Sequence, residues 1–198
     1  MSKALVVGNG ESRKTIDIER YKPDYTLIGC NAIHRDLNVD HLICCDRRMA
    51  AEATSNTSTN NTLIYVRDHW FHFFRKIQKN KNIRHLPELP YKGEAKKDDP
   101  EHWGSGGFAV LLAASLGFKE VEMIGFDLYS VDHSVNNIYK GTQNYSRIDS
   151  KPVDPSYWIY QIGQIFKYYP DTSFVIRNHQ TWNIPLDWQK SNVRFLAL

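Results

Sequence analysis

The sequence predicts a single α/β domain over residues 1–198, with a mostly parallel, Rossmann-like β-sheet that carries helices on both faces. Three observations lead to this prediction. Short apolar runs alternate with helical stretches along the chain, as in folds built from strand–helix–strand units. The runs are continuously apolar, which is typical of parallel strands covered on both faces. The length of 198 residues suits one domain, and neither an internal repeat nor a long linker divides it.

The predicted strands are short apolar runs that end in glycine or a polar residue. The first run, residues 4–7, leads directly into Gly8-Asn9-Gly10, a tight turn expected at the end of a buried parallel strand. The next two runs end at Asn31 and Asp46. In order, the predicted strands occupy residues 4–7, 25–30, 41–45, 63–66, 83–86, 121–125, 174–176 and 193–198.

Three helices are predicted from apolar spacing and from end signals. Residues 68–79 place four large apolar side chains on one face at a spacing of three to four. Residues 108–116 are apolar almost all round, which indicates a buried helix, and Gly117 closes it. Asp154 followed by Pro155 is typical of the start of the last helix, a capping residue and then a first-turn proline.

Two segments carry no such pattern. Residues 87–104 are charged and contain three prolines, which indicates irregular structure. Residues 128–153 are polar and rich in asparagine, and they are longer than an ordinary connection. A long loop in a compact domain is usually a binding loop or a lid. We therefore predict that residues 128–153 form a flexible lid or active-site loop.

Composition excludes several classes of protein. The contents of 41% hydrophobic and 24% charged residues are ordinary for a globular domain. No apolar run approaches the ~20 residues of a membrane-spanning helix, and the first residues are too weakly apolar for a signal peptide. The net charge of +3 fits an anionic small ligand, and no basic stripe indicates a nucleic-acid partner. Three cysteines without C-x-x-C spacing predict a reducing, cytoplasmic location. The sequence leaves open whether the chain forms a homo-oligomer.

Polar residues and glycines gather where the predicted strands end, and this edge of a parallel sheet is where ligands bind. Glycines after the first strand allow a phosphate to approach the backbone, and Ser12 is placed to cap a following helix. For the glycines after the first strand, a tight turn is an equally good explanation. The glycines that open the buried helix expose backbone N–H groups to an anion, and we favour this interpretation over close helix packing because a serine stands with them beside a strand end. The candidate binding residues are Gly8, Asn9, Gly10, Ser12, Asn31, Asp46, Ser105, Gly106, Gly107 and Asp127.

The sequence gives little support for a metal site. His69 and His72 lie three residues apart on a predicted helix, but no third ligand stands near them. No D-x-D triplet follows a strand, so the signature of metal-dependent sugar transfer is missing. We therefore predict no metal site, and we interpret Arg47-Arg48 and residues 75–81 as solvated faces.

Several of these motifs together resemble a known family. In their order and spacing over roughly residues 1–135, they resemble the bacterial sialyltransferases of glycosyltransferase family 42. The same skeleton is similar to a wider group that includes archaeal pterin pyrophosphokinase-like proteins of the domain-of-unknown-function 115 type. The motifs are Gly8-Asn9-Gly10-Glu11-Ser12, Gly29-Cys30-Asn31, Ser105-Gly106-Gly107-Phe108 and Ile124-Gly125-Phe126-Asp127-Leu128-Tyr129.

The resemblance implies a nucleotide-binding domain of the sialyltransferase A-type that uses CMP-sialic acid as donor and needs neither a metal nor another cofactor. It implies that Asn9 and Gly10 lie against the donor phosphate and that Asn31 contacts the cytidine ribose or phosphate. Ser105 and the glycine after it match the family's serine–glycine pair that holds the donor. Asp46 stands where the family has an asparagine that reaches toward the sugar.

The resemblance also implies catalytic residues. Tyr129 matches the first of two tyrosines that hydrogen-bond the leaving phosphate, and Tyr139 is the candidate for the second. The family's catalytic histidine has no counterpart, because residues 140–157 contain no histidine. His133 and Asp154 are the candidates for the general base that takes the proton of the acceptor.

The leading hypothesis is an inverting glycosyltransferase of sialyltransferase type. It transfers a sugar from a CMP-sugar donor to a hydroxyl of a glycan or another acceptor. Two alternatives stay open. One is a pyrophosphokinase-like enzyme that uses ATP with Mg²⁺, and the other is a catalytically degenerate protein that binds a nucleotide or a sugar.

Overall fold

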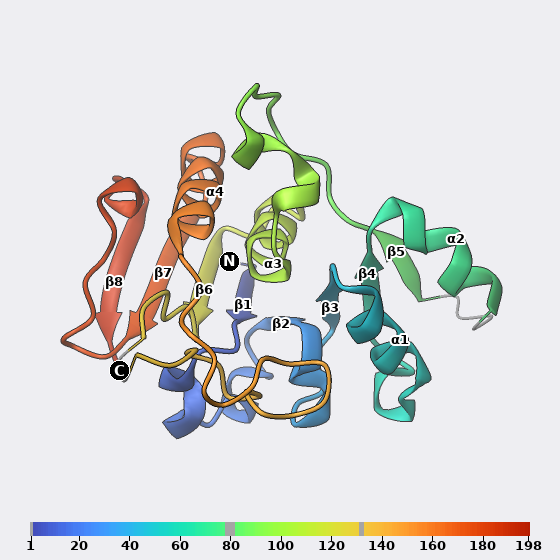
Figure 1. Cartoon of the computed structure of the whole chain (residues 1–198). Helices are drawn as coiled ribbons and strands as arrows, with labels where there is room; N and C mark the ends of the chain where they lie inside the picture. Colours follow the sequence, from blue (N-terminus) through green and yellow to red (C-terminus); the bar gives the residue numbers. More distant parts are fainter. Residues whose placement is uncertain (1, 78–81, 131–132) are drawn as a thin grey trace.

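The computed structural model describes residues 2–77, 82–130 and 133–198. Within these ranges, eight parallel strands form one sheet in the order β5-β4-β3-β2-β1-β6-β7-β8 (Figure 1). The expected α/β fold with a mostly parallel sheet is confirmed. The strands are β1 (Lys3–Val7), β2 (Thr26–Cys30), β3 (His41–Cys44), β4 (Leu63–Val66), β5 (Ile83–His85), β6 (Glu120–Ile124), β7 (Ser173–Asn178) and β8 (Val193–Ala197).

The direction in which the chain adds strands reverses at β1. From β1 the chain adds β2 to β5 on one side, then returns to place β6 on the other side of β1, followed by β7 and β8. Val7 of β1 is thus in register with Gly29 of β2 and with Ile124 of β6. Such a reversal leaves a crevice at the carboxyl ends of the two central strands, where ligands of open α/β sheets bind.

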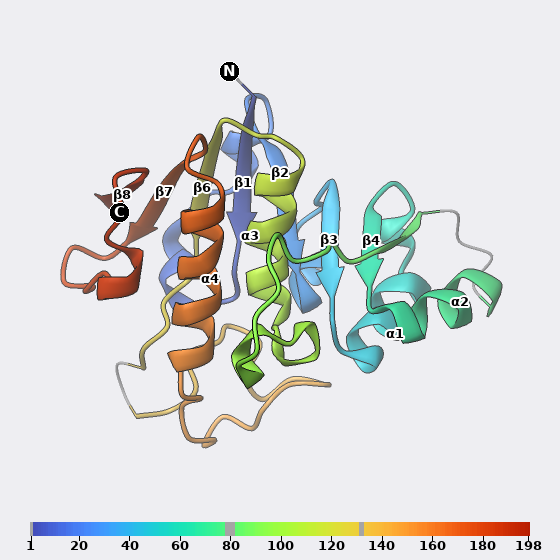
Figure 2. The same cartoon turned by 90° about the horizontal axis from the view of Figure 1, so that it is seen from above.

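Helices cover both faces of the sheet, as expected. The helices α3 (Ser105–Ser115) and α4 (Ser156–Tyr168) lie side by side on one face (Figure 2). The helices α1 (Arg47–Ser55) and α2 (Asp68–Ile77) pack on the other face, toward β3 to β5. Alternate residues of β1 therefore serve two cores: Ala4 and Val6 face α3 and α4, whereas Leu5 and Val7 belong to the opposite core.

The buried helix α3 begins earlier than the apolar run predicted. Its first residue is Ser105, so the glycine pair at 106–107 lies in the first turn, as expected of the glycines that open this helix. The helix is apolar on all sides because the sheet, the neighbouring α4 and buried side chains of the segment before it, such as Trp103, surround it. Gly117 follows its end with a φ of +81°, the left-handed conformation that glycine adopts without strain.

Other elements differ from the prediction. Arg47 and Arg48 are exposed, as their interpretation as a solvated face predicted, but they also begin the unpredicted helix α1, which the Asp46 carboxylate caps by accepting the N–H of Arg48 at 2.7 Å. Only short 3₁₀ turns link β1 to β2, so Ser12 caps no α-helix. The helix predicted over residues 68–79 ends at Ile77, and its last two predicted residues lie outside the described ranges.

No helix in the described part of the chain is both long and apolar enough to cross a lipid bilayer.

We expect Gly8→Ala to lower the free energy of unfolding by about 1–3 kcal/mol, because the added methyl group would overlap the backbone. A Cβ at Gly8 would collide with the carbonyl oxygen of Gly125, which belongs to the main chain and cannot move aside cheaply. Chemical denaturation of the variant measures this loss.

Gly106→Ala is the matched control. Its added Cβ would lie 3.5 Å from the ring of Phe126, an ordinary contact, and alanine favours a helix over glycine. Equal stabilities of the two variants would contradict this account of the turn after β1.

Candidate functional site

A cavity of about 340 Å³ opens where the strand order reverses. We call it the central cavity. The turns after β1, β2 and β6, the first turn of α3 and part of the loop 128–153 line it. In Figure 2 this loop, coloured from yellow to orange, crosses the carboxyl edge of the sheet. Eight of the ten candidate binding residues line the cavity: Gly8, Asn9, Gly10, Asn31, Ser105, Gly106, Gly107 and Asp127.

The turns after β1 and β6 are joined through their backbones. The N–H of Gly8 donates to the carbonyl of Ile124 at 2.8 Å, and the N–H of Gly10 donates to that of Gly125 at 2.9 Å. Gly125 has a φ of +73° and Leu128 a φ of +63°. A left-handed leucine is strained by ~1–3 kcal/mol, and such residues cluster at functional sites. Leu128 is one of the residues that line the central cavity.

Asp127 fastens these two turns together. Its carboxylate accepts the backbone N–H of Ser12 at 2.9 Å and the Ser12 hydroxyl at a short distance, and Asn178 donates to it at 3.4 Å. Asp127 is only 7% exposed. The Ser12 side chain is therefore used inside the protein and does not line the cavity. Asp127 lines the cavity, but its carboxylate mainly holds the shape of the turns.

The Ser105 hydroxyl also forms its hydrogen bonds within the protein. Its hydroxyl accepts the N–H of Cys45 at 3.0 Å and donates to the side-chain oxygen of Asn31 at 2.9 Å. One hydroxyl thus joins the start of α3 to the ends of β2 and β3. It also holds Asn31, whose φ of +53° is left-handed.

The first turn of α3 leaves its backbone N–H groups facing the cavity. No side chain caps this helix end, where Gly104 is the capping residue. The first N–H groups of a helix have no carbonyl partner within it, and they carry the positive end of the helix dipole. Because Gly106 and Gly107 have no side chains to cover these groups, this wall of the cavity can accept an anion.

Tyr145 lines the central cavity and was not identified from the sequence. Its hydroxyl accepts the side-chain N–H of Asn9 at 3.2 Å and the backbone N–H of Ala32 at 3.3 Å. The Asn9 amide also donates to the carbonyl of Cys30 at 3.1 Å. Burial raises the pKa of the Tyr145 hydroxyl, so it keeps its proton at neutral pH. Both acceptor positions of the oxygen are occupied, so the proton is free to donate to a bound group.

The two tyrosines that the resemblance suggested lie elsewhere. Tyr139 is 5% exposed, and its hydroxyl donates to Asp36 and accepts from Arg13 at 2.8 Å. Burial and the Asp36 carboxylate both raise the pKa of Tyr139. Tyr129 is 42% exposed. Neither residue is among those that line the central cavity.

The two candidate general bases also lie outside this lining. His133 is exposed, with a φ of +61°. Asp154 accepts the N–H and the hydroxyl of Ser156, the first residue of α4, at 2.9 and 3.0 Å, and the N-cap position itself is Pro155.

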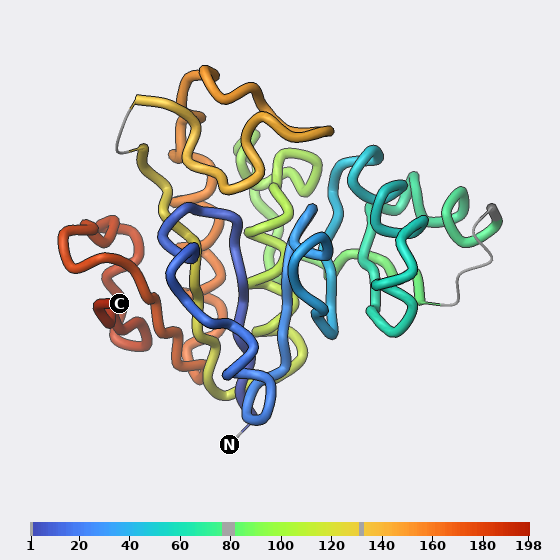
Figure 3. The backbone as a smooth tube through the Cα atoms, turned by 90° about the horizontal axis from the view of Figure 1, so that it is seen from below, coloured from blue at the N-terminus to red at the C-terminus, as the bar shows by residue number. Residues whose placement is uncertain are grey.

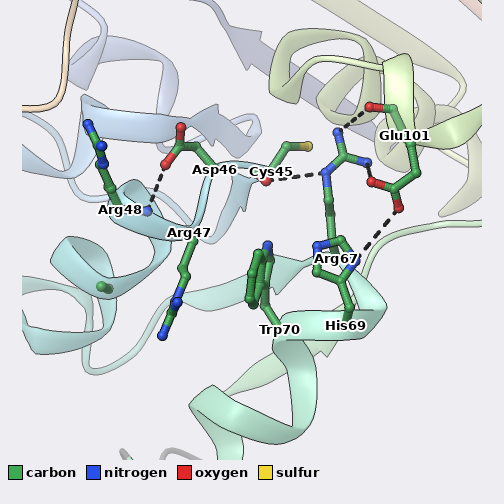
Figure 4. A pocket seen from close by; sticks show the side chains of 9 residues that line it. Cys45, Asp46, Arg47, Arg48, Arg67, His69, Trp70 and Glu101 are labelled. Atoms are coloured by element: carbon green, nitrogen blue, oxygen red, sulfur yellow. Dashed lines mark hydrogen bonds and ion pairs between the residues drawn. The ribbon is translucent and has the colours of Figure 1, made fainter.

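Asp46 lies at a second cavity, of about 590 Å³, beyond the ends of β3 and β4 (Figure 4). We call it the arginine cavity, since three arginines are among its lining residues. The lining consists of Cys45, Asp46, Arg47, Arg48, Ala51, Arg67, His69, Trp70 and Glu101. In the part of the chain that the structure describes, no group of three or more His, Cys, Asp and Glu residues could hold a metal ion.

An ion-pair cluster attaches the loop 128–153 to the body of the protein. Figure 3 shows the loop reaching across to the chain that follows β2. There Arg35 donates twice to Glu52, at 2.6 and 2.7 Å, and also to Thr142 at 2.8 Å. Asn144 donates to the same carboxylate at 2.9 Å. This cluster holds the segment that carries Tyr145, so the segment is tied down rather than free.

We expect Glu52→Gln to lower stability by about 1 kcal/mol at pH 7 and to flatten its dependence on acid pH. The hydrogen bonds from Arg35 lower the pKa of Glu52 below its usual 4.5. A lowered folded-state pKa stabilises the protein above the unfolded-state value, and this contribution is lost as the pH falls through the folded-state value. Thermal unfolding at pH 7, 5 and 3.5 measures the difference between wild type and variant.

The difference between wild type and variant should be largest at pH 7 and should shrink below pH 4.5. Glu19→Gln is the control, because Glu19 forms an exposed ion pair with Lys22 far from the loop. A difference that persists unchanged at pH 3.5 would show that the Glu52 charge does not hold the loop.

Comparison with known proteins shows which fold this is. No family model and no curated protein sequence matches the chain, so neither group named above is supported by sequence. Two solved structures of the sialyltransferase CstII from Campylobacter jejuni are similar. The complex with the substrate analogue CMP-3FNeuAc has a TM-score of 0.54 and 15% identity over 89% of this chain and 80% of that chain. The complex with cytidine-5′-monophosphate has a TM-score of 0.52 and 16% identity over 89% and 79%. The chain thus has a sialyltransferase-like, Rossmann-like fold.

Proposed function

We propose that the protein is a sialyltransferase-type glycosyltransferase that transfers a sugar from a CMP-sugar donor to an acceptor hydroxyl, with inversion at the anomeric carbon. The central cavity is the observation that carries this proposal. It lies at the reversal of strand order, two glycine-bearing turns and the uncapped start of α3 form its walls, and it belongs to a fold shared with a CMP-binding sialyltransferase.

The donor phosphate fits the wall formed by α3. The bare N–H groups at Gly106 and Gly107 supply fixed donors and a positive helix end, which together bind a phosphate without a metal ion. The glycines at 8 and 10 keep the opposite turn free of side chains, so the nucleotide can approach its backbone.

Tyr145 is the side chain best placed to assist the leaving group. In the proposed reaction, the acceptor oxygen forms a bond to the anomeric carbon, and the bond from that carbon to the phosphate oxygen breaks. CMP leaves with the electron pair and gains negative charge on its phosphate. A neutral hydroxyl with a free proton, held by Asn9 and Ala32, stabilises that charge by donating to it.

A general base must take the proton of the acceptor. His133 and Asp154 remain the candidates from the sequence; His133 lies in the loop 128–153 and Asp154 directly follows it. His133→Ala and Asp154→Asn, assayed at a saturating donor concentration, test each assignment. A variant that keeps the full transfer rate removes its residue from the mechanism.

We expect CMP to stabilise the protein in the presence of EDTA. At one hundred times its dissociation constant, a ligand of the folded state adds about 2.7 kcal/mol, a readily measured rise in the unfolding midpoint. UMP and ATP with Mg²⁺ are compared at the same concentration. Stabilisation by ATP with Mg²⁺ alone would contradict the proposal and favour a pyrophosphokinase-like enzyme.

We further expect Tyr145→Phe to weaken CMP binding by about tenfold, the effect of one lost hydrogen bond to a charged group. Tyr129→Phe loses the same hydroxyl at an exposed position outside the cavity and should bind CMP as the wild type does. Isothermal titration of both variants measures the two affinities. If Tyr129→Phe weakens CMP binding and Tyr145→Phe does not, Tyr129 and not Tyr145 contacts the phosphate. CMP binding without turnover of any CMP-sugar would indicate a protein that binds but does not catalyse.

A further inference from the structure

The arginine cavity lies next to the central cavity, with one hydrogen bond between them. Cys45 lines the arginine cavity, and its N–H donates to the hydroxyl of Ser105, which lines the central cavity. Both cavities lie at the carboxyl edge of the sheet, one beyond β3 and β4 and the other beyond β1 and β6. A molecule held in the arginine cavity would therefore lie beside a donor held in the central cavity.

The acidic residues of the arginine cavity already have partners. Glu101 lies 3.5 Å from the Arg67 guanidinium and 3.7 Å from the His69 ring. Asp46 caps α1 through the N–H of Arg48. Arg67 is also engaged, since it donates to the backbone carbonyls of Cys45, Pro100, Glu101 and Trp103 and so builds the cavity wall (Figure 4).

The positive charges of Arg47 and Arg48 have no such partner. No carboxylate of the described residues lies within ion-pair distance of either guanidinium, although both residues line the cavity. They also stand in the first turn of α1, where the positive end of the helix dipole disfavours a cation. Two unfavourable charges at one helix end, without local compensation, indicate a function rather than a contribution to stability.

Arg47 is held in place by aromatic rings. Its guanidinium carbon lies 5.0 Å from the centre of the Trp70 ring and 4.8 Å from that of Phe73. In Figure 4 the Trp70 ring stands between the Arg47 side chain and the His69 ring. A stacked guanidinium is already ordered, so it loses less freedom when it binds a carboxylate or a phosphate.

We propose that the arginine cavity binds the acceptor, and that this acceptor carries a negatively charged group, a carboxylate or a phosphate, which pairs with Arg47 and Arg48. This proposal rests on the proposed transfer of a sugar from the central cavity. It names the class of acceptor as an acidic sugar or a similar anionic hydroxyl compound.

Isothermal titration in the presence of saturating CMP tests the proposal with two matched pairs of probes. Lactose is compared with 3′-sialyllactose, which carries a carboxylate, and glucose is compared with glucose 6-phosphate. We expect at least one charged sugar to bind about tenfold more tightly than its neutral counterpart. The pair that shows the difference identifies the charged group.

The double variant Arg47→Gln/Arg48→Gln should remove this preference, by tenfold or more. It should retain the CMP affinity of the wild type and should unfold at a similar temperature, because relief of the unfavourable charges at the helix start opposes the lost stacking of Arg47. Arg20→Gln is the matched control, since Arg20 is also exposed and stacked, 5.4 Å from the Tyr21 ring, but lies far from the cavity.

The outcomes separate this inference from the proposed function. If CMP binds but the charged sugars bind no better than the neutral ones, or the double variant keeps the preference, the acceptor site is wrong and the donor site stands. If the double variant weakens CMP equally, the arginine cavity belongs to the donor site and the inference fails. If CMP does not bind the wild type, the proposed function fails whatever the sugars do.

Discussion

The close contact between the turns after β1 and β6 is the constraint on which the rest of the site depends. In a parallel sheet whose strand order reverses, these two turns diverge and must be held at a fixed distance if they are to form a cavity. Here the Gly10 N–H bonds to the Gly125 carbonyl at 2.9 Å, and the Asp127 carboxylate holds Ser12 across the gap. A Cβ on Gly8 would overlap the carbonyl group of Gly125, and a Cβ on Gly10 would overlap the carboxylate of Asp127. The glycines are therefore required by the approach of the two turns as well as by a ligand.

In the central cavity, side chains mainly fix the shape of the walls, whereas backbone groups face the space in which a ligand would bind. The polar groups of Ser105, Asp127 and Asn31 are bonded within the protein, so they set the shape of the walls. Among the groups that we propose to meet a ligand are the N–H groups of the first turn of α3 and the proton of Tyr145. In the arginine cavity, Arg67 binds backbone carbonyls and forms part of the wall. There the groups that we propose to meet a ligand are side chains, the guanidinium groups of Arg47 and Arg48.

The sequence predicted the sheet well because parallel strands buried on both faces are continuous apolar runs; the strand predicted at residues 63–66 has the observed limits, Leu63–Val66. It missed α1 because this short helix begins with two arginines, and its cap, Asp46, was interpreted as a ligand residue. The glycine pair, which was expected to open the buried helix, lies in the first turn of α3.

The contents of the site were harder to predict than its position. Strand ends locate the central cavity, and eight of the ten candidate residues line it. Tyr145 was missed because its contacts are to Asn9 and Ala32, more than a hundred positions away in the chain, and its loop has no periodic pattern. Tyr139 is the opposite case. Its position after the matching motifs suggested a ligand contact, whereas burial beside Arg13 and Asp36 could not be inferred from local sequence.

The backbone amide signals of the glycines test the central claim most directly, because the claim is that backbone groups hold the donor phosphate. In a ¹H–¹⁵N spectrum recorded with and without CMP, we expect the signals of Gly8, Gly10, Gly106 and Gly107 to shift. Those of Gly117 and Gly163, which do not line the central cavity, should stay in place. Saturable CMP binding that moves other amides and leaves these four unchanged would contradict the account.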